Sequence, residues 1–167
     1  MSIAQSVLPE FDHEMASTRK ALERVPADKA SWKPHPKSFT LGDLAAHISN
    51  LPSWTVYTLR DRELDLNPPG GQPWKSPTFE STEATLKRFD ENVAAARAAI
   101  EKARDADFDL SWTLKSGGHE IFTMPRVVVL RSFVLNHLIH HRGQLTVYLR
   151  LNDVPVPGLY GPSADEQ

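Results

Sequence analysis

Four stretches of the chain repeat apolar residues at steps of three and four, which is the spacing of one face of an amphipathic helix. Such segments can bury their apolar faces only against one another, so the pattern predicts an all-α fold of the four-helix-bundle type. The predicted helices span about residues 3–22, 41–59, 82–103 and 125–151.

Residues that favour helix starts and helix breaks mark the predicted boundaries. Thr40 and Ser81 precede the second and third helices, and their hydroxyl groups can accept a hydrogen bond from the first turn. Pro9 lies inside the first helix and allows a kink or a later start, whereas Pro52 removes an amide donor from the second helix and predicts a kink there. Pro125 suits the first turn of the last helix.

The pattern changes between residues 108 and 123, where two short alternating runs flank Gly117-Gly118. This predicts a small β-hairpin directly before the last long helix. Residues 61–80 are rich in proline and glycine and have no periodicity, so we expect a long loop that covers one end of the bundle. No internal repeat or low-complexity tract is present, and residues 1–167 are interpreted as a single helical-bundle domain.

Composition narrows the range of functions. The chain of 167 residues is 40% apolar and carries a net charge of -2, and its basic residues are scattered. Neither nucleic acid nor an anionic membrane is therefore an expected partner. The start of the sequence lacks the features of a signal peptide, and no apolar run has membrane-spanning length, which predicts a cytoplasmic protein. The chain contains no cysteine, which excludes disulfides, zinc–thiolate sites and a cysteine nucleophile.

Three histidines, His137, His140 and His141, fall within five positions of the last predicted helix. His137 and His141 lie one turn apart and differ by about 40° around the helix axis, so both imidazoles can reach one point beside the helix. His140 can also pair with His137, but it falls toward the edge of the apolar stripe. We therefore favour His137 and His141 as metal ligands. The alternative is a pair of core histidines hydrogen-bonded to backbone groups or carboxylates.

Two further histidines lie on predicted helices. His47 is in phase with the apolar face that Leu44 and Leu51 form, so we expect it to point inward. Taken alone, His47 is interpreted as a hydrogen-bonded core histidine. His13 lies near the edge of the first helix and can approach the site, but a solvated or ordinary hydrogen-bonded role is expected for it.

The segment Asn-His-Leu-Ile-His-His-Arg-Gly-Gln-Leu at residues 136–145, together with Leu-Ala-Ala-His-Ile at residues 44–48, resembles the DinB/YfiT-like superfamily. The resemblance spans nearly the whole chain and includes Tyr-Leu-Arg at residues 148–150. It also includes the approach to the second helix, from Trp-Lys-Pro at residues 32–34 to Thr-Leu-Gly at residues 40–42. It implies that one histidine from the second helix and two from the last, four residues apart, bind a divalent metal ion. The matching residues are His47, His137 and His141.

The resemblance also implies classes of function, because some relatives use low-molecular-weight thiols in transfer or isomerisation reactions. Independently of the family, three imidazoles without a thiolate suit Zn, Ni, Fe or Mn and leave a position for water or substrate. We therefore expect a metal-dependent enzyme that acts on a small molecule, either a hydrolase or a thiol S-transferase. The alternatives are a non-enzymatic, stress-related metal-binding module and a dimeric bundle whose histidines are structural.

Two residues after the histidine pair are candidates for orienting a substrate. Gln144 and Tyr148 follow His137 by seven and eleven residues on nearly the same helix face, with plain packing as the alternative. No residue is assigned as catalytic. A homodimer is expected because relatives commonly dimerise and because three tryptophans exceed what a small bundle readily buries. These tryptophans are Trp54, Trp74 and Trp112.

Overall fold

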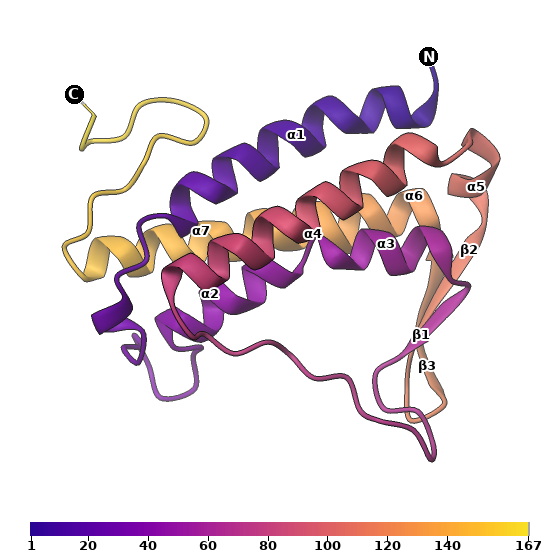
Figure 1. The fold of residues 1–167 in the computed structure, drawn as a ribbon, viewed down its shortest axis with the longest axis horizontal. Coiled ribbons are helices and arrows are strands. Elements are labelled where there is room, and N and C mark those ends of the chain that lie inside the picture. The colour runs from indigo at the N-terminus through magenta and orange to yellow at the C-terminus, as the bar shows by residue number, and fades with distance from the viewer. Residues whose placement is uncertain (167) are drawn as a thin grey trace.

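The computed structural model describes residues 1–166 and confirms the helical bundle, with a small sheet at one end (Figure 1). α1 and the α2–α3 pair each pack against both α4 and the last helical path, which is built from α6, η2 and α7. The bounds are α1 Ile3–Leu22, α2 Leu41–Asn50, α3 Ser53–Arg60, α4 Thr82–Lys102, α6 Arg126–Val128, η2 Val129–Leu135 and α7 Asn136–Leu151.

Side-chain caps explain where the long helices begin. The hydroxyl of Thr40 accepts a hydrogen bond from the Asp43 amide at 3.0 Å, and that of Ser81 accepts one from the Ala84 amide at 3.1 Å. Both predicted helix starts are therefore confirmed. α1 begins with a capping box, in which Ser2 and Gln5 each bond the other's backbone amide with their side chains. Such caps satisfy amide donors that the first helical turn leaves without partners.

The two prolines inside predicted helices behave differently. Pro9 is accommodated within α1, which continues through it without interruption. Pro52 separates α2 from α3, because its missing amide breaks the hydrogen-bond ladder one turn after His47. The kink predicted at this proline is thus present as a break between two helices.

The predicted hairpin is confirmed and forms most of the sheet. β2, Ser111–Ser116, pairs antiparallel with β3, His119–Pro125, around Gly117 and Gly118. Their φ angles of 63° and 79° are the positive values that a tight two-residue hairpin turn requires. A third strand, β1 at Glu63–Asp65, pairs in parallel with β2 and was not predicted, because three residues are too few to show alternation. From β1 the Pro/Gly-rich loop runs back along the bundle to the start of α4 (Figure 1).

Two shorter helical elements also escaped prediction, namely η1 at Ala27–Lys29 and α5 at Asp105–Asp109. More important for the site, the last helix is not uniform. Its segment η2 is π-helical and ends directly before α7, which carries the histidines. A π turn holds more residues than an α turn, so it shifts the side-chain register between α6 and α7. None of the helices in residues 1–166 is long and apolar enough to cross a bilayer.

The tryptophans do not support the expected homodimer. Trp112 is fully buried and Trp54 is 9% exposed within the single chain, while Trp74 is half-buried against Trp54 and Tyr57. The bundle therefore accommodates these side chains itself, with help from the sheet and the loop. The expectation that they exceed its capacity is wrong, because it considered the helices alone.

A buried ion pair connects α7 with α1. Arg142 Nη2 lies 2.7 Å from the Glu14 carboxylate, and the two side chains are only 1% and 7% exposed. Arg142 also donates to the Glu14 carbonyl and to the Thr18 hydroxyl. The C-terminal tail covers the pair, since the Tyr160 hydroxyl donates to the Glu14 carboxylate and accepts from Arg142. Each charge is therefore compensated despite its removal from water.

Replacing Glu14 by Ala is expected to lower the free energy of unfolding by about 3 kcal/mol or more, because it leaves the Arg142 charge buried and unpaired. Asp12→Ala is the matched control on the same helix: it removes the Asp12–Arg97 pair, whose side chains are 43% and 41% exposed. The control should cost about 1 kcal/mol or less. Chemical denaturation of both variants checks this, and equal losses would contradict a special role for the buried pair.

Candidate metal centre

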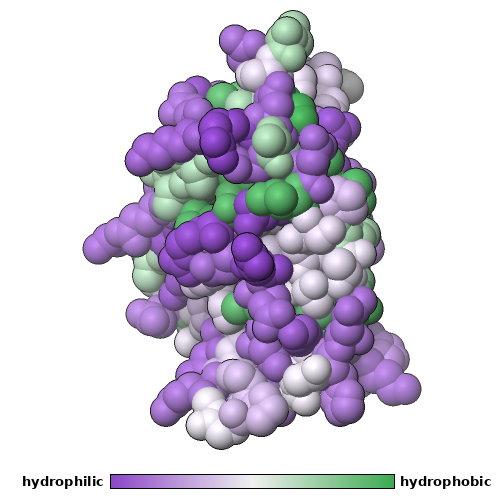
Figure 2. Space-filling view, turned by 90° about the vertical axis from the view of Figure 1, so that its right-hand side faces the viewer, coloured by the Kyte–Doolittle hydropathy of each residue, from purple (hydrophilic) through white to green (hydrophobic). Residues whose placement is uncertain are grey.

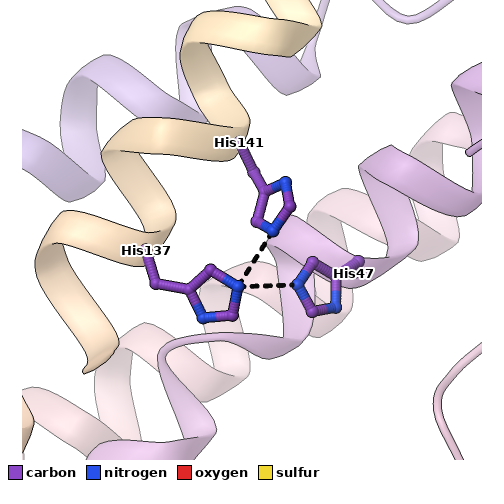
Figure 3. A group of neighbouring side chains, drawn as sticks. All are labelled: His47, His137 and His141. Atoms are coloured by element: carbon purple, nitrogen blue, oxygen red, sulfur yellow. Dashed lines mark hydrogen bonds between the residues drawn. The ribbon is translucent and has the colours of Figure 1, made fainter. Parts of the chain in front are cut away.

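Three histidine side chains from two helices point toward one another (Figure 3). His47 comes from α2, and His137 and His141 come from successive turns of α7. The Nε2 atom of His137 lies 3.4 Å from that of His47 and 2.9 Å from that of His141. One ligand nitrogen from each residue lies within 4.8 Å of the other two. The three residues selected from the sequence are thus the three that the fold brings together.

Helix phase and packing explain why these side chains converge. Residues 137 and 141 share a face of α7 because they are four apart. On α2, the neighbours of His47 that face the core, Leu44, Ile48 and Leu51, are all buried. Since α2 packs against α7, this burial fixes the rotation of α2 and directs His47 toward the pair on α7.

The protonation pattern fits a set of metal ligands. Gln144 Oε1 lies 2.7 Å from His141 Nδ1, and because a carbonyl oxygen can only accept, His141 must carry its proton on Nδ1. Its Nε2 therefore presents a lone pair toward His137. A protonated His137 Nε2 can donate its one proton to only one of the two nitrogens that face it, His47 Nε2 and His141 Nε2. An unprotonated His137 Nε2 would place its lone pair against that of His141 Nε2 at 2.9 Å. Hydrogen bonds alone therefore do not satisfy the three nitrogens well, whereas one cation would satisfy them all.

The spacing of the nitrogens agrees with such an ion. Ligand nitrogens at about 2.0–2.1 Å from a tetrahedral ion lie about 3.3–3.4 Å from one another, and a narrower angle between two ligands shortens that distance. The separations of 3.4 and 2.9 Å fall at and slightly below this value. The residues present therefore fit a divalent metal ion.

Electrostatics keeps the imidazoles in the neutral form that binds metals. Burial, reinforced by the neighbouring His141 and His137, lowers the pKa of His47 to about 4. Burial is also the main cause that lowers the pKa of His137 and of His141. A lower pKa means that protons compete less for the nitrogens, so lone pairs are available at neutral pH.

Two phenylalanines border the histidines. Phe39, from the connection before α2, stacks on the His47 ring with a centroid distance of 5.6 Å and remains 47% exposed. Phe133, in the π-helical segment η2, contacts the His137 ring at 5.5 Å. Sequence reasoning missed both. Phe39 lies in a proline-rich stretch without periodicity, and Phe133 lies beside the apolar stripe, four residues before His137, where its contact with the histidine was not predicted.

The other candidate residues take different positions. His140 is exposed and lies outside the convergent set, and its Nε2 is 3.1 Å from Gln144 Nε2. Gln144 thus contacts both His140 and His141, and its contact with Nδ1 restricts the orientation of the His141 ring. Whether Gln144 also contacts a substrate stays a prediction.

Tyr148 and His13 are not part of the convergent set either. Tyr148 is 9% exposed and packs edge-on against Trp32, with ring centroids 5.4 Å apart, so packing accounts for its position. Its proposed contact with a substrate also stays a prediction. His13 is exposed and stacks on Tyr160 of the C-terminal tail, which agrees with the ordinary role expected for it.

Comparison with known proteins supports the fold and the resemblance. The chain is 26% identical over 163 residues to the protein YrdA of Bacillus subtilis strain 168, covering 95% of this chain and 89% of the relative. A DinB-like protein from Bacillus cereus ATCC 10987 has a similar crystal structure, with a TM-score of 0.70, 26% identity, and coverage of 92% of this chain and 95% of that one. The DinB-like protein YjoA from Bacillus subtilis shares the fold at a TM-score of 0.68 and 17% identity, covering 97% and 98% of the two chains. Residues 10–145 match the DinB superfamily, and the chain therefore belongs to that superfamily.

Proposed function

We propose that this protein is a metal-dependent enzyme in which His47, His137 and His141 hold one divalent ion that activates water or a low-molecular-weight thiol. The observation that carries the proposal is the convergence of three neutral imidazole nitrogens, with no carboxylate or thiolate among them. Three protein ligands leave a position for a small molecule, which is typical of catalytic rather than structural zinc sites. Neutral imidazoles favour Zn, Ni, Fe or Mn over Mg or Ca.

An ion at this position would lower the pKa of water to about 7 or hold a thiol as its thiolate. The chain itself supplies ligands and their orientation. Gln144 fixes the proton of His141 on Nδ1, so that Nε2 stays free to bind. Since the chain contains no cysteine, any thiol must arrive as a substrate. A hydrolase and a thiol S-transferase are therefore the two reaction classes that we propose.

Aromatic side chains would shape access to the ion. Phe39 covers one side of His47, and Phe133 covers one side of His137. Trp54 contacts Phe133 and also Trp74 of the Pro/Gly-rich loop, with centroid distances of 5.3 and 5.4 Å. The loop is thus connected to the site through successive aromatic contacts. We propose that this apolar border favours substrates with an apolar part and that the loop influences their entry.

Metal content provides the first test. Protein purified without an affinity tag is expected to carry about one divalent ion per chain, and His47→Ala, His137→Ala and His141→Ala should each remove it, since two remaining ligands bind weakly. His140→Ala is the matched control, because His140 neighbours the site but does not converge with it. Elemental analysis and calorimetric titration with Zn²⁺ measure the effect.

In the same titrations, Gln144→Ala should weaken binding by about 10-fold to 100-fold through loss of the His141 orientation. If His140→Ala empties the site while His141→Ala does not, the assignment of the ligands is wrong. If the purified wild-type protein carries no divalent ion and also binds no Zn²⁺ in the titration, the histidines are structural.

Activity provides the second test. Thiol conjugation to electrophiles and hydrolysis of simple esters and amides should be screened with the metal-loaded protein, the chelated protein and the His137→Ala variant. Turnover is expected only in the metal-loaded protein, because the chain contains no cysteine that could act as a nucleophile without the ion. Turnover that survives both chelation and His137→Ala would defeat the mechanism. Stoichiometric metal binding without turnover would favour the alternative of a non-enzymatic, stress-related metal-binding module.

We also propose a homodimer, which now rests on the resemblance to the family and on two exposed apolar residues of α7. Val147 and Leu151 lie one turn apart and are 56% and 57% exposed. Light scattering at micromolar concentration should give twice the chain mass of 18.7 kDa. Val147→Lys should shift the mass toward that of one chain if α7 forms the interface, and a monomeric wild-type protein would contradict the proposal.

A further inference from the structure

Arg126, the first residue of α6, is a buried cation without an ion pair. It is 5% exposed, and no carboxylate in residues 1–166 lies within 4.0 Å of its guanidinium. Its Nη2 donates to the Asp61 carbonyl at 2.8 Å and its Nη1 to the Asp107 carbonyl at 3.4 Å, while its Nε is buried with no partner in the described part of the chain. A guanidinium has five N–H donors, so most of its hydrogen-bonding capacity is unused.

The nearby carboxylates are engaged by other arginines. The carboxylate of Asp61 accepts two hydrogen bonds from Arg60, at 2.9 and 2.8 Å. That of Asp107 accepts two from the Arg104 side chain, at 3.1 and 2.9 Å. Arg126 donates hydrogen bonds only to the neutral backbone carbonyls of Asp61 and Asp107, and its charge acts on their carboxylates from a greater distance, where it helps to lower their pKa. Removing a charge from water without a counter-ion in direct contact is costly, and the unpartnered Nε points to a ligand that supplies one.

Arg126 lines an open cavity of about 420 Å³ at the surface, between α3, the end of α4, α5 and the start of α6. Arg60, Lys102 and Asp107 also line it; Arg60 is paired with Asp61 and Asp107 with Arg104, so Arg126 and Lys102 are the lining cations without an ion pair in residues 1–166. Lys102 lies in the last turn of α4, is exposed, and forms no ion pair with any residue in the range 1–166. The charge of the cavity wall therefore favours an anion.

The remaining wall of the cavity is apolar. Val56 and Leu59 of α3 face Ala99 and Ala103 at the end of α4. A volume of several hundred Å³ with apolar walls and a few convergent polar groups is typical of small-molecule sites. Figure 2 looks onto this end of the molecule, where hydrophilic side chains surround a band of hydrophobic ones. The cavity thus has room for an apolar group beside a charged one.

We propose that this cavity binds a small organic anion, with its phosphate or carboxylate head at Arg126 and Lys102 and its apolar part against Val56, Leu59 and Ala99. The site is separate from the metal centre. Arg126 precedes His137 by eleven residues, which is about 15 Å along the helical path, and none of the three histidines lines the cavity. A guanidinium and an ammonium group together form charge-assisted hydrogen bonds to either head group.

Calorimetric titration with phenyl phosphate, benzoate and the neutral analogue benzyl alcohol tests the proposal. At least one of the two anions should bind with a dissociation constant at or below about 1 mM, and benzyl alcohol should not. The comparison of the two anions identifies the preferred head group. In addition, the Nε–H signal of Arg126 in an NMR spectrum of ¹⁵N-labelled protein, assigned with Arg126→Lys, should shift on titration with the anion that binds.

Matched variants separate local binding from general attraction to positive charge. Lys102→Glu and Lys87→Glu both lie on α4 at exposed positions and change the net charge equally. Lys102→Glu should weaken anion binding at least about tenfold, because it replaces a charge-assisted hydrogen bond by repulsion, whereas Lys87→Glu should change it less than about twofold. His137→Ala should retain binding, since the anion does not need the metal centre.

Equal effects of the two lysine substitutions would overturn the proposal, as would loss of binding in His137→Ala or the absence of binding by both anions. Because Arg126 is buried, Arg126→Lys can destabilise the fold, so the folding of this variant should be verified by circular dichroism. Lys102→Glu keeps the test decisive if Arg126→Lys does not fold.

Discussion

The rotation of α7 about its own axis is the constraint on which the candidate site depends. Two adjacent residues of this helix, His141 and Arg142, point about 100° apart and contact different neighbours. Arg142 reaches α1, where it pairs with Glu14, and His141 faces His47 of α2. A rotation that moved the histidine pair away from His47 would also separate a buried arginine from its carboxylate. The ion pair with α1 therefore helps to position the histidines that face α2.

The two buried arginines of the last helical path, Arg142 and Arg126, differ in the partners that compensate for the loss of water around their charges. Arg142 has a carboxylate, a carbonyl, a threonine hydroxyl and a tyrosine hydroxyl around it, so its desolvation is compensated. Arg126 has only two carbonyl partners and an Nε without one. The first is explained by structure alone. The burial of Arg126 is explained better by an anionic ligand, because a buried cation without a counter-ion in direct contact is costly.

The π-helical segment η2 links these regions. It lies between Arg126 and the histidines, and it carries Phe133, which contacts His137. A continuous α-helix from α6 to α7 would have one register throughout. The wider π turns between them change the angle around the helix axis between the side chains of α6 and those of α7. The register between α6, which follows the sheet, and the histidines of α7 therefore includes a local departure from α-helical geometry.

The sequence by itself determined the main helices, the hairpin and the pair of His137 and His141, because these depend on local rules, whereas His47 joined the pair through the resemblance to the family. Caps at Thr40 and Ser81, a proline break, a Gly-Gly turn and a spacing of four residues act within a few positions of the chain. Only the tertiary structure decided the rest. The short strand β1, the burial of Trp54 and Trp112 and the partners of Arg126 depend on residues distant in sequence, and no apolar repeat indicates the π segment or the contact of Phe39 with His47. Their energies come from packing and desolvation, which no local pattern records.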